Sequence, residues 1–424
     1  MATFTATSVA DTCSMAKRAA TQLAALPSGV KNAALEAIAG ALLERTPEIL
    51  EANARDLETG REAGLTDALM DRLALDPERV AVIARQVRDI AALPDPVGEV
   101  IEGRRLYNGL DVRKVRVPLG VIAVVYEARP NVTIDAAALC LKSGNAVVLR
   151  GSSMAAHSNE VLAAVASEAA VGAGLPEGAM ALVAGGGHEE LAELATQSGV
   201  IDLIIPRGGE GLKAALKGVA TVPVMYAASG NCHLYVDATA SVPDAVAIAL
   251  NAKVQRPSVC NAVETLLVHE TVADEFLPRA LAALRDAGVE LRGDARVRAA
   301  ASSGSVPVAP ATEEDWGTEY HALTLAVGVV DSVQEAIEHI NRYGSGHSEA
   351  IVTRDTDAAR AFELGVDAAC VYVNASTRFT DGGEFGMGAE IGNSTQKLHA
   401  RGPIGVRELC TFKYLVEGSG QVRG

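Results

Sequence analysis

Hydrophobic residues recur at helical spacing through roughly the first hundred positions of the chain. Leu35, Ile38, Leu42 and Leu43 follow this spacing in a stretch that also carries charged residues, as expected of an amphipathic helix. Prolines at positions 27, 47, 77, 94 and 96 interrupt the pattern. Residues 7 to about 100 are therefore predicted to form a series of helices.

An alternating pattern replaces the helical one between residues 104 and 117. Val115 and Val117 alternate with the charged residues Lys114 and Arg116, and strict alternation is typical of a strand with one polar face. This stretch does not continue the helices before it. We expect it to form a hairpin arm that leaves the domain.

From Gly120 onwards, short apolar runs alternate with helical patterns. An apolar run without alternation is typical of a strand that is buried on both faces. The predicted strands are 121–126, 146–149, 180–183 and 200–205, with helices around 132–143, 154–173 and 188–197. This order predicts a parallel sheet wrapped by helices.

A second α/β pattern begins after Cys260, so the sequence predicts two such domains that meet near residue 253. Its predicted strands are 264–269, 323–330, 350–352 and 370–373, and its helices are 272–287, 332–341 and 356–364. Residues 380–405 contain seven glycines and are predicted to be a loop. The stretch 406–416 resembles a final strand.

Composition and charge exclude several classes of function. Hydrophobic residues make up 49% of the 424 positions and the formal net charge is -16, which suits a globular protein and disfavours binding to nucleic acid or anionic membranes. No uncharged apolar run reaches the ~20 residues of a membrane span. The N-terminus shows no pattern of a secretory signal. We expect a soluble, cytoplasmic protein.

Six cysteines occur, at positions 13, 140, 232, 260, 370 and 410, without a CxxC pair. They indicate neither a disulfide framework nor a zinc site, and no metal is expected. Cys260 lies in the polar stretch from Gln255 to Asn261, close to Arg256. Positive charge and hydrogen-bond donors favour the reactive thiolate, so Cys260 is a candidate nucleophile. The alternative is an inert loop cysteine.

Two predicted strands end in arginine followed by small residues. One gives Arg150, Gly151, Ser152 and Ser153, and the other gives Arg207, Gly208 and Gly209. Ligands of parallel sheets collect at the carboxyl ends of strands, and helix N-termini attract anions. Both segments are candidate cofactor sites, and two arginines favour NADPH over NADH. The alternative is an ordinary capped helix with a solvated arginine. Residues 185–187 are a third glycine run, with a tight turn as the simpler interpretation.

Asn131 follows the predicted strand 121–126. An amide at a strand end can donate a hydrogen bond to a developing oxyanion. The alternative is that its side chain caps the helix that follows.

At this point whole stretches of the sequence resemble a known family. The chain is similar to the γ-glutamyl phosphate reductase family of the aldehyde dehydrogenase superfamily over nearly its whole length, most clearly from Val117 to Tyr414. The stretches that carry the resemblance are 117–131, 142–153, 255–262, 316–320 and 385–397.

The resemblance implies an aldehyde dehydrogenase-like α/β fold with two parallel-sheet domains and a small β oligomerisation arm. It assigns residues 1–103, 118–252 and 385–404 to a Rossmann-like cofactor-binding domain, 253–384 to a catalytic domain, and 104–117 with 405–424 to the arm.

The resemblance also implies roles for single residues. Cys260 matches the nucleophile, and Asn131 matches the oxyanion donor that acts with the backbone N–H of Cys260. Arg150 takes the place of a cofactor-binding lysine, and Glu319 matches the glutamate that holds the nicotinamide ribose. Hydrolytic relatives carry a water-activating glutamate where this chain has only Ala227 to Asn231, without a carboxylate.

The implied reaction is NADPH-dependent reduction of L-glutamyl 5-phosphate to L-glutamate 5-semialdehyde and phosphate, in proline biosynthesis, through a thioacyl form of Cys260. Arg256 and Arg378 are candidates for the phosphate or carboxylates of the substrate, with surface ion pairs as the alternative. A homo-oligomer and a functional link to glutamate 5-kinase are implied. The rival functions are a coenzyme A-acylating aldehyde dehydrogenase, a binding protein on an inactive dehydrogenase scaffold, and a cysteine hydrolase.

Overall fold

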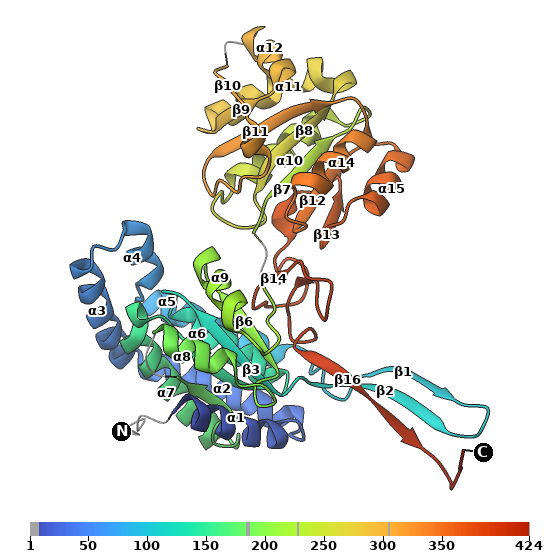
Figure 1. The fold of residues 1–424 in the computed structure, drawn as a ribbon. Helices are drawn as coiled ribbons and strands as arrows, with labels where there is room; N and C mark the ends of the chain where they lie inside the picture. The colour runs from blue at the N-terminus through green and yellow to red at the C-terminus, as the bar shows by residue number, and fades with distance from the viewer. Residues whose placement is uncertain (1–7, 184–186, 227–228, 304–305, 424) are drawn as a thin grey trace. The chain divides into compact units, whose positions relative to one another are not determined.

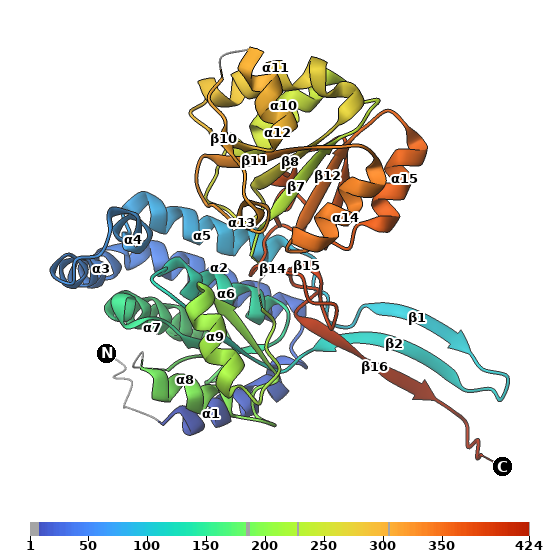
Figure 2. The ribbon, with the colours of Figure 1, turned by 45° about the horizontal axis from the view of Figure 1, so that its top comes forward.

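The chain divides into two compact units, and each is described on its own (Figure 1, Figure 2). The computed structural model describes residues 8–183, 187–226, 229–303 and 306–423. The first unit comprises Met1–Tyr226, Met387–Gly392 and Ile404–Gly424, and the second comprises Ala227–Gly386 and Asn393–Pro403.

Helices open the first unit, as the hydrophobic spacing predicts. They are α1 (Val9–Leu23), α2 (Ser28–Glu44), α3 (Thr46–Glu62), α4 (Asp67–Leu73) and α5 (Pro77–Ala92). Pro47 and Pro77 lie in the first turns of α3 and α5, where the missing N–H of proline has no helical partner to lose. The prolines therefore mark helix starts.

A parallel sheet with strand order β5-β4-β3-β6 follows in the same unit. Its strands are β3 (Val121–Tyr126), β4 (Ala146–Arg150), β5 (Met180–Leu182) and β6 (Leu203–Arg207). The helices that accompany it are α6 (Asn131–Lys142), the 3-10 helix η1 (Ser153–Ala155), α7 (Ala156–Gly172), α8 (His188–Ala195) and α9 (Glu210–Val219). Every residue of β3 and β4 is buried, which explains their unbroken apolar runs.

A separate antiparallel sheet contains β1 (Val100–Arg105), β2 (Asp111–Pro118) and β16 (Cys410–Glu417). β1 and β2 form the predicted hairpin, and β16 pairs with β2 from Cys410 opposite Pro118 to Glu417 opposite Asp111. Figure 2 shows these three strands side by side. The final strand begins at Cys410, four residues later than predicted.

The second unit is built on a sheet of order β10-β9-β11-β8-β7-β12-β13. Its strands are β7 (Cys232–Val236), β8 (Val263–His269), β9 (Glu290–Gly293), β10 (Ala309–Pro310), β11 (Thr324–Val330), β12 (Ser348–Val352) and β13 (Cys370–Val373), all paired in parallel. The helices are α10 (Val242–Val254), α11 (Glu270–Asp286), α12 (Ala295–Ser303), α13 (Glu313–Trp316), α14 (Val333–Tyr343), α15 (Thr356–Gly365) and the 3-10 helix η2 (Thr377–Phe379). Two short strands, β14 (Asn393–Ser394) and β15 (Gly402–Pro403), pair within the predicted glycine-rich loop.

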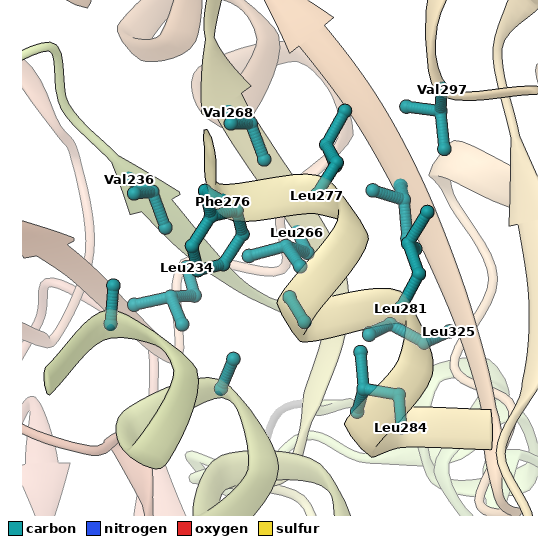
Figure 3. Packing of buried hydrophobic residues seen from close by; sticks show 14 of the residues in the cluster. Leu234, Val236, Leu266, Val268, Phe276, Leu277, Leu281, Leu284, Val297 and Leu325 are labelled. Carbon is teal, nitrogen blue, oxygen red and sulfur yellow. The ribbon is translucent and has the colours of Figure 1, made fainter. Parts of the chain in front are cut away.

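Alternate residues of the central strands serve two cores on the two faces of this sheet. Leu234 and Leu266 pack with Phe276 and other residues of α11 on one face (Figure 3). Their chain neighbours Tyr235 and Leu267 pack with residues of α14 and α15 on the other. The alternation follows from the two-residue repeat of a strand.

The boundary between the units differs from the predicted one. The first stretch of the first unit ends at Tyr226 rather than near residue 253, because β7 and α10 belong to the second unit. Of the stretch 385–404, which was predicted to join the first domain, only Met387–Gly392 does so. β7 escaped prediction because His233 interrupts its apolar run, although that side chain is fully buried and paired with Glu349.

The two parallel sheets and the antiparallel arm confirm the predicted fold class. Within the described residues, no helix combines the length and apolar character needed to cross a bilayer. The same part of the chain shows no group of three or more histidine, cysteine or acidic residues suited to a metal ion.

Candidate active site

Cys260 lies in the loop 255–262, which connects α10 to β8 in the second unit. It is the one cysteine of six that is not buried, and all six are free thiols. Burial raises the pKa of Cys13 to about 11 and that of Cys410 to about 12, so these thiols stay protonated and unreactive. Exposure therefore singles out Cys260 as the reactive candidate.

A buried ion pair joins the two elements that flank this loop. Lys253, in the last turn of α10, pairs with Glu264, the second residue of β8, and both side chains are shielded from solvent. Burial raises the pKa of Glu264 to about 7 against the attraction of Lys253, and burial lowers the pKa of Lys253. The pair links the two elements from which the loop emerges.

Gly230 packs directly against the backbone of Cys260. A Cβ atom at position 230 would lie 1.8 Å from the carbonyl oxygen of Cys260, so a side chain there requires the loop to move. The Cys232 thiol donates to the same carbonyl oxygen at 3.2 Å. The segment before β7 therefore packs against the loop 255–262 at the Cys260 carbonyl.

Glu319 also contacts this segment. The backbone N–H of Gly230 donates to Glu319 Oε1 at 2.7 Å, and His321 Nε2 lies 3.3 Å from Glu319 Oε2. Burial opposes ionisation of Glu319, but the contacts with His321 and Gly230 outweigh it and lower the pKa. Glu319 therefore presents a carboxylate next to the glycine that contacts Cys260.

Arg378 also belongs to the surroundings of Cys260. Its Nε donates to Gln255 Oε1 at 2.7 Å, and Thr377 donates to the carbonyl of Asn261 at 2.7 Å, so η2 is tied to the nucleophile loop. Burial and the nearby charge of Arg256 lower the pKa of Arg378. Neither arginine has an ion-pair partner among the residues described here, which argues against the alternative of surface ion pairs.

The two arginine segments predicted to bind the cofactor lie at the carboxyl edge of the sheet in the first unit, whereas Glu319 belongs to the second unit. Arg150 of β4 pairs in register with Val125, and Arg207 of β6 pairs with Tyr126, on the two sides of β3. Asn131 begins α6 five residues after the end of β3. The chain runs from β3 to β4 on one side and returns to β6 on the other, so β3 and β6 border the topological switch point where parallel sheets bind ligands.

Arg150 is buried rather than solvated. Its Nη2 donates to the carbonyl of Gly187 at 2.7 Å, and its Nε is buried without a hydrogen-bond partner. A Cβ atom at Gly151 would lie 2.1 Å from Nδ2 of Asn159, so this glycine permits packing against α7. Ser152 caps η1 by accepting from the Met154 N–H, and Ser153 is the first residue of that helix. Two of the three glycines at 185–187 lie outside the described residues.

The segment from Arg207 to Gly209 is more open than the segment from Arg150 to Ser153. Gly208 permits a close approach to Glu127, because a Cβ atom would lie 2.7 Å from its carboxyl carbon, whereas Gly209 faces open space at the start of α9. Arg207 is half-buried, and its charge acts on the Asp135 carboxyl of α6.

Asn131 does not cap α6 with its side chain, so the capping alternative is wrong. Its Nδ2 donates instead to Oδ2 of Asp135, one turn later, at 2.9 Å. Burial raises the pKa of Asp135 to about 6, against the hydrogen bond from Asn131 and the charge of Arg207. The amide is thus held by its own helix.

Comparison with known proteins identifies the family of this chain. The sequence matches the model of the aldehyde dehydrogenase family over residues 1–304. Curated γ-glutamyl phosphate reductases of Thermobifida fusca and Moorella thermoacetica are each 57% identical over 408 residues, which span 96% of this chain and 97% of each relative. The chain belongs to the aldehyde dehydrogenase family, among its γ-glutamyl phosphate reductases.

Solved structures extend this family likeness to three dimensions. A crystal structure of γ-glutamyl phosphate reductase from Thermotoga maritima matches with a TM-score of 0.96 and 45% identity, over 99% of this chain and 100% of that one. An acetylating aldehyde dehydrogenase from Geobacillus thermoglucosidasius matches with a TM-score of 0.69 at 19% identity. That second likeness shows the aldehyde dehydrogenase fold alone.

Sequence reasoning missed Asp135, Gly230 and the pair Lys253–Glu264. Two of them carried a signal, because Asp135 lies in a mostly apolar helix and Glu264 in a mostly apolar strand, where an unpaired charge is costly. Gly230 carried none, since its partner is a backbone carbonyl 30 positions away in the chain.

Proposed function

We propose that this chain catalyses the NADPH-dependent reduction of L-glutamyl 5-phosphate to L-glutamate 5-semialdehyde and phosphate. The observation that carries the proposal is Cys260, the one cysteine that is not buried, whose loop packs on Gly230 and is tied to η2. The identity of 52–57% to curated γ-glutamyl phosphate reductases supports the choice of substrate. The reaction is a step of proline biosynthesis.

The Cys260 thiolate attacks the γ-carbonyl carbon, the bond to the phosphate oxygen breaks, and a thioester with Cys260 forms. The charge of Arg378 acts on the Cys260 thiol, and nearby positive charge favours the thiolate. Arg256 and Arg378 repel each other when no anion lies between them. A phosphate or carboxylate of the substrate relieves that repulsion and is bound bidentately by guanidinium groups.

The family resemblance implies that Asn131 and the backbone N–H of Cys260 donate to the oxygen that gains negative charge during acyl transfer and reduction. No carboxylate lies in the stretch from Ala227 to Asn231 to activate water. The thioester therefore resists hydrolysis until reduction, and collapse of the thiohemiacetal then releases the aldehyde and regenerates the thiolate.

The residues present fit a nicotinamide cofactor. Glu319 presents a carboxylate next to the segment that contacts Cys260, and such a group accepts further hydrogen bonds from ribose hydroxyls. Arg150 with its unpartnered Nε, Gly151, Ser152, Ser153, Arg207, Gly208 and Gly209 supply cations and small residues at the carboxyl edge of the first sheet. When bound, the reduced cofactor supplies the hydride. The two arginines support the choice of NADPH over NADH.

The assay that tests this function runs the reaction backwards. With glutamate 5-semialdehyde, NADP⁺ reduction should require inorganic phosphate, and coenzyme A should not replace it. Cys260→Ser should abolish this activity while leaving the unfolding temperature unchanged, and Cys370→Ser, at a buried thiol outside the site, serves as the control. Equal rates with coenzyme A would instead identify an acylating aldehyde dehydrogenase, and undiminished turnover of Cys260→Ser would reject covalent catalysis.

The remaining assignments belong to the same proposal. The first unit binds the cofactor, the second carries the nucleophile, and the sheet of β1, β2 and β16 joins subunits of a homo-oligomer. Exposed Val100, Phe412, Tyr414 and Val416 in its strands, and exposed Tyr107 between β1 and β2, support the last point, because exposed apolar patches mark interfaces. We place the enzyme in the cytoplasm, where it acts after glutamate 5-kinase.

A further inference from the structure

The contact between Asn131 and Asp135 defines how the Asn131 amide is oriented. The two residues are four positions apart in α6 and so share one face of the helix. Nδ2 of Asn131 donates to Oδ2 of Asp135 at 2.9 Å, whereas Oδ1 of Asp135 is buried without a hydrogen-bond partner. A partly unsatisfied buried carboxyl destabilises a fold, so its presence calls for a role.

A primary amide has two nearly isosteric orientations that exchange its oxygen and its NH₂ group. An ionised carboxylate only accepts hydrogen bonds, so it stabilises the orientation in which NH₂ faces Asp135. One N–H of Asn131 is then engaged, and the second N–H of the planar group points away from Asp135. The opposite orientation would place two acceptor oxygens in contact.

Arg207 of β6 balances the charge of this carboxyl. It is the charged group that acts on Asp135, and the amide of Asn131 is the other polar contact, among the residues that the structure describes. A lone carboxylate beside an oxyanion site would oppose the charge that develops there. The guanidinium of Arg207 offsets that repulsion while the hydrogen bond to Asn131 stays in place.

We infer that Asp135 is a positioning residue that holds the Asn131 amide in its donating orientation. The inference rests on the proposed function, in which Asn131 donates to the acyl oxygen. Asp135 does not touch the substrate and acts through Asn131.

The first test replaces Asp135 by asparagine, which has nearly the same shape but can accept or donate. We expect kcat to fall about tenfold, as for the loss of one charge-assisted hydrogen bond, with the KM for NADPH within about twofold of wild type. The unfolding temperature at pH 7.5 should not fall, because the neutral amide avoids the unfavourable burial of a charge. A wild-type kcat would overturn the inference.

A double-mutant cycle separates positioning from a general structural effect. Asn131→Ala should lower kcat by about 10²–10³, and adding Asp135→Asn to that variant should change kcat less than about twofold, since no amide remains to orient. Additive losses would overturn the inference alone. A wild-type kcat of Asn131→Ala would overturn the oxyanion role and the inference together.

The pH profile gives a third readout. Because the pKa of Asp135 is raised to about 6, the carboxyl gains a proton below that pH, and its O–H then favours the orientation with the Asn131 oxygen facing it. Wild-type kcat should therefore fall below about pH 6, and this acid limb should be absent in Asp135→Asn. An acid limb with the same midpoint in that variant would contradict the inference.

Asp56→Asn provides the matched control in the same unit. Asp56 is a buried carboxylate of α3 that accepts from the Ser158 N–H at 2.7 Å, remote in sequence from α6. Its replacement should lower the unfolding temperature and leave the acid limb of kcat unchanged. A shift of that limb would show that destabilisation alone alters the profile and would overturn the inference.

Discussion

At the scale of single residues, the site is defined by close backbone contacts as much as by reactive side chains. The family resemblance singled out Cys260 and Glu319, and the fit of guanidinium groups to phosphate and carboxylates singled out Arg256 and Arg378. The structure brings these four residues to one region of the second unit. The requirement for glycine at position 230 was not predictable. It arises from a contact with the Cys260 carbonyl that only the folded chain creates.

Gly230→Ala should therefore inactivate the enzyme without touching a reactive group. The added Cβ would lie 1.8 Å from the Cys260 carbonyl oxygen, and the displaced loop should lose about 10²-fold in kcat/KM and about 1–3 kcal/mol in the free energy of unfolding. Steady-state assays and chemical denaturation measure both. Gly218→Ala is the control, since a Cβ atom there meets nothing within 4 Å, and full activity of Gly230→Ala would refute the packing argument.

At the scale of elements, the ends of parallel strands position the candidate functional segments, as Arg150 and Arg207 show at the ends of β4 and β6. Buried strands such as β3 were predictable from unbroken apolar runs. β7 was not, because the buried pair of His233 with Glu349 places a polar residue where the pattern requires an apolar one. The start of α6 was predicted within one residue, yet the role of its fifth residue, Asp135, depends on a side-chain contact that hydrophobic spacing does not encode.

A further prediction concerns the buried ion pair between α10 and β8. Lys253→Met leaves Glu264 buried without its partner and should lower the free energy of unfolding by about 3–5 kcal/mol. The double variant Lys253→Met/Glu264→Leu removes both charges and should regain most of that loss. Denaturant unfolding at pH 7.5 measures each value, and a double variant no more stable than the single one would contradict the pairing argument.

At the scale of the whole molecule, the two units were predictable but their boundary was not. Strand–helix alternation indicates two parallel sheets, whereas pairing partners decide which sheet a strand joins, and β7 pairs with β8 and β12 of the second unit. The arm was predictable as alternating sequence. Its apolar surface became visible only in the structure, where Phe412 and Tyr414 are exposed.

That surface leads to the last prediction. Under the proposed role of the arm in a homo-oligomer, Phe412→Asp/Tyr414→Asp should shift the protein to a smaller species, because two added charges oppose burial of this surface between subunits. Light scattering coupled to size-exclusion chromatography measures the mass. The control is Leu364→Asp, at an exposed apolar position of α15 outside the arm. An unchanged mass in the double variant would remove the arm from the interface.

The distribution of sulfur in this fold has a practical consequence. Five cysteines are buried, and the sixth, Cys260, is partly exposed. A small alkylating reagent applied to the native protein therefore encounters a single accessible target per chain. Stoichiometric labelling followed by mass spectrometry then counts competent chains in a preparation, which turns measured velocities into true turnover numbers.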